Sequence, residues 1–162
     1  MDKAGLDPAL GLDAHLAAQA KSSGKPTGGL ETGTQQIAFL DSMDRSEQIQ
    51  FLAEALDESA NGNDELERLH AAWRRGEVAT LWNGMAEQMK HDYPDLFWHV
   101  DVERNDAWVP KIRQRLQAPG HDNTLVVVGA LHLLGKEGVV EQLRAKGYRV
   151  ERICSACASG GR

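Results

Sequence analysis

The sequence predicts an α/β (α+β) protein in which a helical body is followed by a βαβ end. Two observations predict this class. Apolar residues recur at helical spacing from residue 9 to residue 116, which is the pattern of amphipathic helices. Near the carboxyl end, an apolar run at residues 125–128 is followed by a short amphipathic segment and then by alternating residues. That succession is typical of a strand–helix–strand unit.

The first helix is expected at residues 9–21. Asp7 is a helix-capping residue type, and Pro8 has a fixed φ that suits the first helical turn. Apolar residues then follow at a spacing of four. Residues 25–31 form a short extended piece, and a second helix begins near Thr34.

A capping box predicts where the third helix begins. Asp44 is followed three residues later by Glu47, so that each side chain can bond the other residue's backbone N–H. From Ile49 onward, apolar residues lie at i, i+3, i+4 and i+7, which predicts one buried stripe. Asn-Gly-Asn at residues 61–63 predicts a turn. Two further helices are expected after it, the first of them ending at Gly76.

Prolines divide the last helical segment of the body. Pro94 separates this segment from the helices before it. Trp108 shares a spacing of four with Ile112 and Leu116, so we expect it in the core. Pro110 is expected to kink or restart the helix, because proline lacks the backbone N–H that the helix needs.

The βαβ end is predicted from residues 124–135, TLVVVGALHLLG. Its β-branched run at 125–128 reads as a buried strand that Gly129 terminates. A helix is expected at residues 136–146, and a second strand at residues 149–153. Such units pair their strands in parallel with a right-handed crossover.

The length of 162 residues indicates one domain. The net charge of −6 and the pI near 5.5 argue against nucleic acid as a partner. No stretch has the apolar length of a transmembrane segment, and the amino terminus lacks a signal-peptide pattern. Cys154 and Cys157 form a single C-x-x-C motif, which suits a redox pair, half of a zinc site or a local disulfide. We expect the motif to be incidental.

His132 is the strongest candidate for a chemical role. It lies three residues after Gly129, just beyond the carboxyl end of the expected strand, where open α/β sheets bind their ligands. Imidazole can act as a base, an acid or a metal ligand. A hydrogen-bonded structural histidine is the alternative.

Four segments lie in order along the chain: GLDPALGLDAHL (5–16), GKPTGGLET (24–32), ERNDAWVPKI (103–112) and VVVGALHLLGKEGVVEQLRAKGYRVERI (126–153). Together they resemble the carboxyl-terminal half of the TraB/GumN family. This group includes the TraB and PrgY pheromone-shutdown proteins, the GumN proteins and the Tiki proteases. The resemblance implies a bacterial protein in which residues 1–153 are half of a fold related to the erythromycin-esterase and ChaN group and residues 154–162 are a tail.

The resemblance implies a divalent-metal-dependent hydrolase of the peptidase type. Residues 129–132 match the family's second GxxH motif, and Glu31 matches an acidic position. His132 and Glu31 would then be ligands of Mn, Co or Zn, which activates water and polarises a carbonyl group. Arg104 and Asn105 match an R-N pair, so the implied catalytic residues are Glu31, Arg104 and His132, with Asn105 binding substrate. A helix-capping role for Glu31 and a structural salt bridge for Arg104 are the alternatives.

The family pattern also has a first GxxH motif, which we expect in an amino-terminal half that this chain lacks. Two kinds of function therefore stay open. One is a hydrolase that acts on a peptide or small molecule and is completed by a second copy or by the complementing half. The other is a non-catalytic module that binds a peptide or pheromone. The resemblance suggests an exported or cell-envelope location for a full-length protein.

Overall fold

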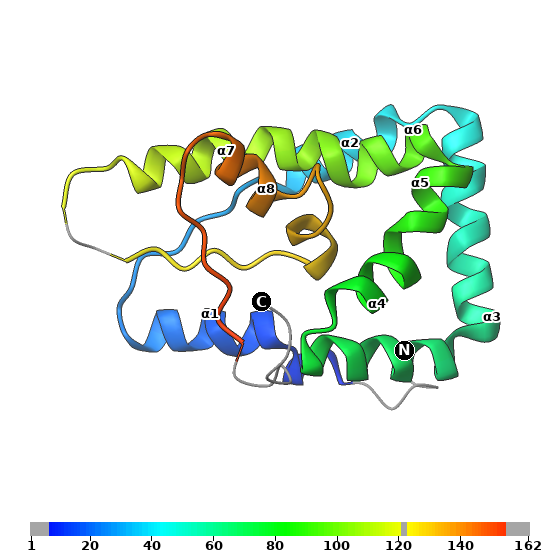
Figure 1. Ribbon diagram of the computed structural model, residues 1–162, viewed down its shortest axis with the longest axis horizontal. Helices are drawn as coiled ribbons and strands as arrows, with labels where there is room; N and C mark the ends of the chain where they lie inside the picture. The colour runs from blue at the N-terminus through cyan, green and yellow to red at the C-terminus, as the bar shows by residue number, and fades with distance from the viewer. Residues whose placement is uncertain (1–6, 121–122, 155–162) are drawn as a thin grey trace.

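The computed structural model describes residues 7–120 and 123–154, with the backbone alone for residue 8 and residues 57–63. Helices account for all of the regular secondary structure in these ranges (Figure 1). In chain order the elements are η2 (Pro8–Leu10), α1 (Leu12–Ser22), α2 (Gly33–Ser42), α3 (Arg45–Arg75), α4 (Val78–Trp82), η3 (Asn83–Glu87), α5 (Gln88–Asp92), α6 (Pro94–Phe97), η4 (Trp98–Glu103), α7 (Arg104–Leu116), η5 (Ala130–Leu133) and α8 (Val139–Ala145).

The prediction of an α/β fold with a βαβ end is wrong, because no β-strand forms within the described residues. The crossover helix is present as α8, but the segments at 123–129 and 148–154 are extended chains without a ladder. They run in different directions in Figure 1. A strand requires a neighbouring backbone to pair its N–H and C=O groups, and neither segment has one among the described residues. Leu125 and Ile153 are accordingly 73% and 96% exposed.

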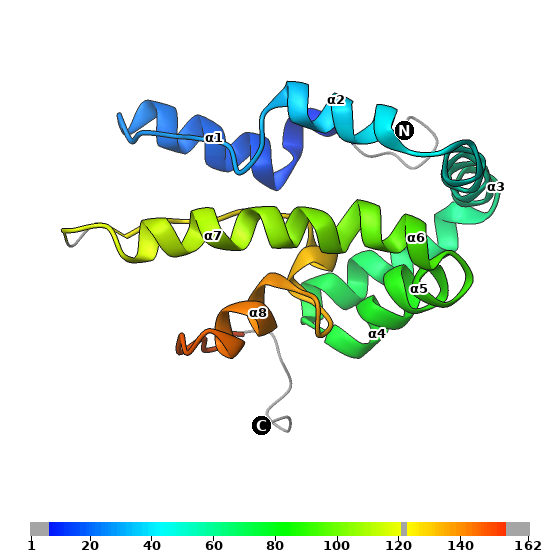
Figure 2. The ribbon, with the colours of Figure 1, turned by 90° about the horizontal axis from the view of Figure 1, so that it is seen from above.

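The helices lie in layers when the molecule is seen from above (Figure 2). α1 and α2 form one layer, and α6 and α7 run along the middle. α4, α5 and α8 form a third layer on the other side of α7. α3 stands at one end, where the chain passes from the first layer to the third.

Capping interactions fix where α2 and α3 begin. Asp44 accepts a hydrogen bond from the backbone N–H of Glu47 at 2.9 Å, and Glu47 accepts one from the N–H of Asp44 at 2.7 Å. The predicted capping box is therefore confirmed. Thr32 and Gln35 make a second box at the start of α2, which the sequence analysis did not identify. These boxes satisfy backbone donors that the first helical turn leaves unpaired.

α3 continues through residues 61–63, so the turn predicted there is wrong. The Asn-Gly-Asn sequence instead lies where α3 changes direction between its two arms (Figure 1). Glycine within a helix weakens it and is a common cause of bending. The helix ends as predicted at Gly76, whose φ of 67° is left-handed backbone that suits glycine.

Two π-helical turns interrupt the second half of the helical body. One is η3, and the other is η4, which leads directly into α7 without a break in helical backbone. Pro110 lies inside α7, so the helix does not restart at this proline. A proline within a helix costs about 3 kcal/mol. Buried residues on both sides of it, Val109 and Ile112, hold the helix together.

The apolar core lies between α7 and α8. It consists of Trp108, Val109, Ile112, Val139 and Leu143. Partly buried residues of the extended segments, Leu30, Val128, Tyr148 and Val150, pack against it. This core positions the residues described next. In the described part of the chain, no helix combines the length and the apolar character that crossing a membrane requires.

Candidate functional site

α7 supplies three residues of the candidate site from one helical turn. Arg104 and Asn105 open the helix, and Trp108 follows one turn later on the same side. Asn105 is fully buried and Trp108 is 4% exposed, whereas the Arg104 side chain retains 24% of its exposure. The packing of α7 against the core therefore fixes Asn105 and Trp108 and leaves the guanidinium of Arg104 partly exposed.

His132 reaches the site from η5, the short 3-10 helix that follows Gly129. Its backbone N–H donates to the carbonyl of Gly129 at 3.1 Å, which closes the tight turn of the GxxH motif. The imidazole is 8% exposed and packs on the ring of Trp108, with the centroids 4.6 Å apart. The ring therefore lies against an apolar wall, and its two nitrogens face polar partners.

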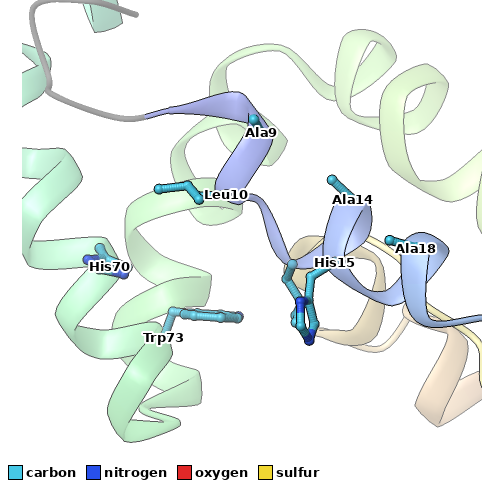
Figure 3. A pocket seen from close by; sticks show the side chains of 8 residues that line it. Ala9, Leu10, Ala14, His15, Ala18, His70 and Trp73 are labelled. Carbon is cyan, nitrogen blue, oxygen red and sulfur yellow. The ribbon is translucent and has the colours of Figure 1, made fainter.

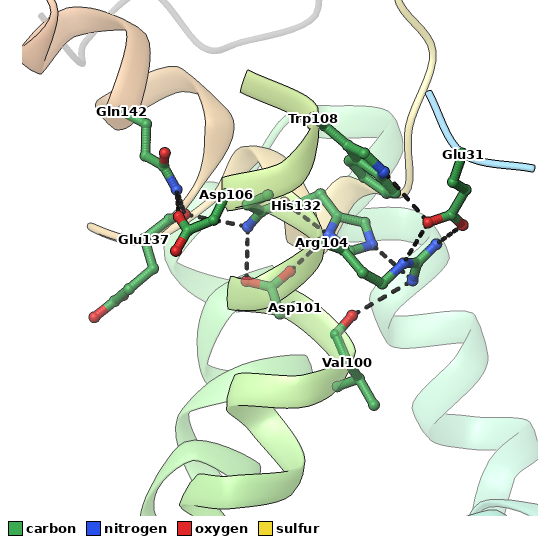
Figure 4. A network of polar contacts seen from close by, with 10 residues as sticks. Glu31, Val100, Asp101, Arg104, Asp106, Trp108, His132, Glu137 and Gln142 are labelled. Carbon is green, nitrogen blue, oxygen red and sulfur yellow. Dashed lines mark hydrogen bonds and ion pairs between the residues drawn. The ribbon is translucent and has the colours of Figure 1, made fainter. Parts of the chain in front are cut away.

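A buried polar cluster holds one side of the His132 ring (Figure 4). Nδ1 lies 2.9 Å from Oδ1 of Asn105 and 2.9 Å from Oδ1 of Asp101. The amide of Asn105 donates to Oδ2 of Asp101 and to the backbone carbonyl of Glu137, both at 3.1 Å. Asp101 is fully buried in η4, one turn before Asn105.

Arg104 and Glu31 form the other side of the site (Figure 4). Glu31 receives hydrogen bonds from Nη2 of Arg104 at 2.8 Å, from its Nε at 3.3 Å and from Nε1 of Trp108 at 3.3 Å. Nη1 of Arg104 lies 3.3 Å from Nε2 of His132. The guanidinium also lies over the Trp108 ring, 4.7 Å from its centroid, which adds a cation–π contact.

The loop before α8 connects the site to a second ion pair. Lys90 contacts Glu137 at 2.7 Å and lies over the rings of Trp82 and Phe97. The hydrogen bond from Lys90 is the main reason that the pKa of Glu137 lies below its ordinary value. Because the backbone carbonyl of Glu137 accepts from Asn105, this ion pair helps to fix the loop beside the site.

The structure thus brings together all four of the residues that the sequence analysis selected. Glu31, Arg104, Asn105 and His132 come from three distant segments and share one network. Their chemical roles stay predictions. Asp101 was not among the residues predicted from the sequence. The one sign of its involvement is that this carboxylate lies four residues, about one helical turn, before Asn105.

Comparison with protein families bears on these residues. The model of the TraB/PrgY/gumN family matches residues 1–152. The chain belongs to this family. No curated protein and no solved structure matches the chain. The resemblance inferred from the four sequence segments is therefore confirmed at the level of the family.

The TraB/PrgY/gumN resemblance implied a metal ion at His132 and Glu31, and the surrounding charges test that expectation. Nε2 of His132 and both carboxylate oxygens of Glu31 face the guanidinium of Arg104. A divalent cation between them would meet a positive charge at close range. Within residues 7–120 and 123–154, no three His, Cys, Asp or Glu side chains converge. Catalytic zinc sites usually have three protein ligands, so this set alone does not fit a metal.

A separate pocket lies away from this network, between the amino-terminal helices and the last turns of α3 (Figure 3). Leu10 and His15 approach it from one side, and His70 and Trp73 from the other. Its complete lining is Ala9, Leu10, Leu12, Ala14, His15, Ala18, His70 and Trp73. The lining is mainly apolar, and His70 stacks on Trp73 with their centroids 6.2 Å apart.

Proposed function

We propose that this TraB/PrgY/gumN family protein takes part in the hydrolysis of peptide-type bonds, with His132 as the general base. The observation that supports this role is that acceptor groups contact one ring nitrogen of His132 and a donor group contacts the other. Nδ1 faces the oxygens of Asp101 and Asn105, while Nε2 faces the more open side of the network, toward Arg104. A histidine held in this way keeps its lone pair on Nε2, which would accept a proton from a reactant once Nη1 of Arg104 gives up its contact with that atom.

Arg104 is the proposed stabiliser of negative charge. A guanidinium can donate two hydrogen bonds to a carboxylate or to the oxyanion formed during acyl transfer. Each guanidinium nitrogen of Arg104 already contacts Glu31, the Val100 carbonyl or His132, so a substrate would have to displace one of these contacts. Glu31 and the Trp108 ring restrict the movement of Arg104. In the proposed reaction, Nε2 takes a proton from water and the resulting hydroxide adds to the substrate carbonyl. The proton then passes to the leaving amine as the C–N bond breaks.

Substrate binding by Asn105 stays a prediction, and the geometry favours a supporting role. Its side chain is fully buried, and its amide N–H and C=O groups all have protein partners. A substrate would have to displace one of these contacts. Asn105 is therefore assigned to holding His132 in our proposal.

Dependence on Mn, Co or Zn also stays a prediction. The described residues provide two candidate ligands, so further donors would have to come from outside the described part of the chain, from a second copy or from another chain. We accordingly expect this chain by itself to bind metal weakly and to be at best a very weak hydrolase.

A second candidate function is the binding of an apolar peptide without catalysis. The pocket between α1 and α3 favours it, because Leu10, Leu12 and Trp73 remain 81%, 50% and 48% exposed around it. Exposed apolar groups that gather at a hollow are typical of peptide-binding surfaces. This pocket does not include the residues of the His132 network.

The proposed hydrolase is tested by measuring cleavage of a fluorogenic peptide library, with and without manganese or cobalt. We expect slow cleavage by the wild-type chain and a loss of about a hundredfold, or to background, in His132→Ala. His91→Ala is the matched control, since the His91 side chain is 87% exposed and pairs with its neighbour Asp92. It should retain wild-type turnover.

Two outcomes would contradict the proposal. Cleavage that is equal in His132→Ala and wild type would exclude His132 as the base. Peptide binding that is lost in Trp73→Ala, in a protein without measurable cleavage, would favour the binding function.

Tight stoichiometric metal together with fast turnover by the monomer would contradict the expectation that this chain is a weak hydrolase alone.

A further inference from the structure

Asp101 has an unusual position for a carboxylate. It is fully buried, and it lies in the π-helical turn η4 rather than at the surface. Its Oδ2 accepts a hydrogen bond from Asn105, and its Oδ1 accepts none of good geometry. Oδ1 is instead 2.9 Å from Nδ1 of His132. Buried carboxylates are costly unless they are paired, so this contact requires an explanation.

The orientation of the Asn105 amide follows from its surroundings. Its nitrogen lies 3.1 Å from the Asp101 carboxylate and 3.1 Å from the backbone carbonyl of Glu137. Both of these neighbours can only accept hydrogen bonds when the carboxylate is ionised. The amide NH₂ group must therefore face them, which leaves the amide oxygen directed at His132.

The orientation of Asn105 in turn sets the tautomer of His132. Nδ1 is close to two oxygens, one from Asn105 and one from Asp101, and both require a donor. Nδ1 must carry the proton, and in the neutral ring Nε2 then keeps its lone pair. The contact between Nε2 and the Arg104 guanidinium agrees with this assignment, because arginine can only donate.

We infer that Asp101 is a positioning residue that fixes the Nδ1–H tautomer of His132, through the Asn105 amide that it orients and through the carboxylate oxygen that it holds 2.9 Å from Nδ1. This inference rests on the proposed role of His132 as a base. In a serine-protease triad, replacing the equivalent aspartate by asparagine lowers kcat about 10⁴-fold because the histidine adopts the wrong tautomer. Here the Asp101 carboxylate lies 2.9 Å from the same ring atom, and the oxygen of Asn105 accepts the hydrogen bond of that atom.

The charge of Asp101 matters as well as its shape. Asparagine at position 101 has one oxygen and one NH₂ group, so it cannot accept from both neighbours. If its oxygen accepts from the Asn105 amide, its NH₂ group faces Nδ1 of His132. An NH₂ donor at this place favours the tautomer in which Nδ1 has the lone pair. Asp101→Asn keeps the volume of the side chain and changes only this polarity.

The test is the tautomer of His132 measured by long-range ¹⁵N–¹H NMR on histidine-labelled protein. We expect the wild-type ring to be in the Nδ1–H form and Asp101→Asn to shift it measurably toward the Nε2–H form. Asp95→Asn, an exposed aspartate in α6, is the matched control and should leave the signals unchanged. His132 is assigned from the loss of its signals in His132→Ala.

An Nε2–H ring in the wild-type protein would overturn the inference, even if Asp101→Asn failed to fold. A wild-type tautomer retained in folded Asp101→Asn would also overturn it. Peptide cleavage is a separate readout. Equal cleavage by His132→Ala and wild type refutes the proposed function, whereas the tautomer refutes or supports the positioning role of Asp101.

Discussion

Two regions of the layered structure are held in different ways. Around α7 and α8, apolar side chains are buried, and Ile112 and Leu143 are 6% and 9% exposed. α1 and α2 contain no buried residue, and Ile37 on α2 is 69% exposed. The first region is stabilised by apolar burial, which scales with the area removed from water. The second region requires another kind of attachment.

Polar contacts of the segment before α2 supply part of that attachment, beside the contact of the Phe39 ring with His99. Glu31 is bonded to Arg104 and Trp108, and Lys111 donates to the backbone carbonyl of Leu30. The same contacts that hold α2 near α7 also restrain the guanidinium of the candidate site. The site residue Glu31 therefore also helps to attach the α1–α2 region to α7. Experiments can test this attachment separately from the apolar core.

The largest expected difference between the two regions comes from matched isoleucine truncations. Ile112→Ala should lower the free energy of unfolding by about 2–5 kcal/mol, because it leaves a cavity beside Trp108 and Val139. Ile37→Ala should change it by no more than about 0.5 kcal/mol. Both residues lie in helices, so helix propensity cancels. Chemical denaturation measures both variants, and equal losses would refute the contrast.

A smaller effect is expected from Glu31→Gln. Both side chains of the Glu31–Arg104 pair are about three-quarters buried, so the loss should be about 1–2 kcal/mol. Hydrogen exchange should rise in residues 24–42 while α7 and α8 stay protected. Glu141→Gln removes an exposed pair with Arg144 and should cost less than about 0.5 kcal/mol. Unchanged exchange in residues 24–42 would show that another contact holds this region.

The smallest effect concerns pH and the Lys90–Glu137 pair. The hydrogen bond from Lys90 holds the pKa of Glu137 below its ordinary value of 4.5. The resulting stabilisation is present above that value and is lost as the pH falls through the lower pKa of the folded protein. Because both side chains are a third or more exposed, we expect only a few tenths of a kcal/mol.

Lys90→Met keeps the packing on Trp82 and Phe97 and removes the charge. Its free energy of unfolding should therefore fall less steeply than that of wild type between about pH 6 and pH 3. Denaturant titrations at several pH values measure the two slopes. Identical slopes would indicate that the ion pair does not contribute to folding.

Much of the helical body follows from local sequence signals. The Asp44–Glu47 box and Gly76 mark helix ends through interactions within a few residues, so they were predictable. The absence of strands at residues 125–128 and 149–153 could not be predicted in this way. Their composition favours extended chain, and the chain is extended there, but pairing depends on a neighbouring backbone that local sequence does not specify.

The candidate site was found mainly from motif spacing and from family resemblance. Glu31, Arg104, Asn105 and His132 matched segments that could be recognised in the sequence, and they meet in space. Asp101 was missed because a spacing of four residues from Asn105 does not by itself show that a carboxylate is buried. Its burial results from η4, and a π-helical turn has no reliable signature in a single sequence.

The π-helical turn η4 also determines which changes of chain length this protein can tolerate. Such a turn accommodates one more residue than a regular α-helical turn. Deleting one residue between 98 and 103 would allow a regular α-helical turn that keeps Phe97 and Asn105 in nearly the same register. Inserting one residue would instead rotate Phe97 by about 100° relative to Asn105. Either the core contacts of Leu96 and Phe97 or the polar face of α7 would then turn away. We expect family members to lose a residue in this segment far more readily than to gain one.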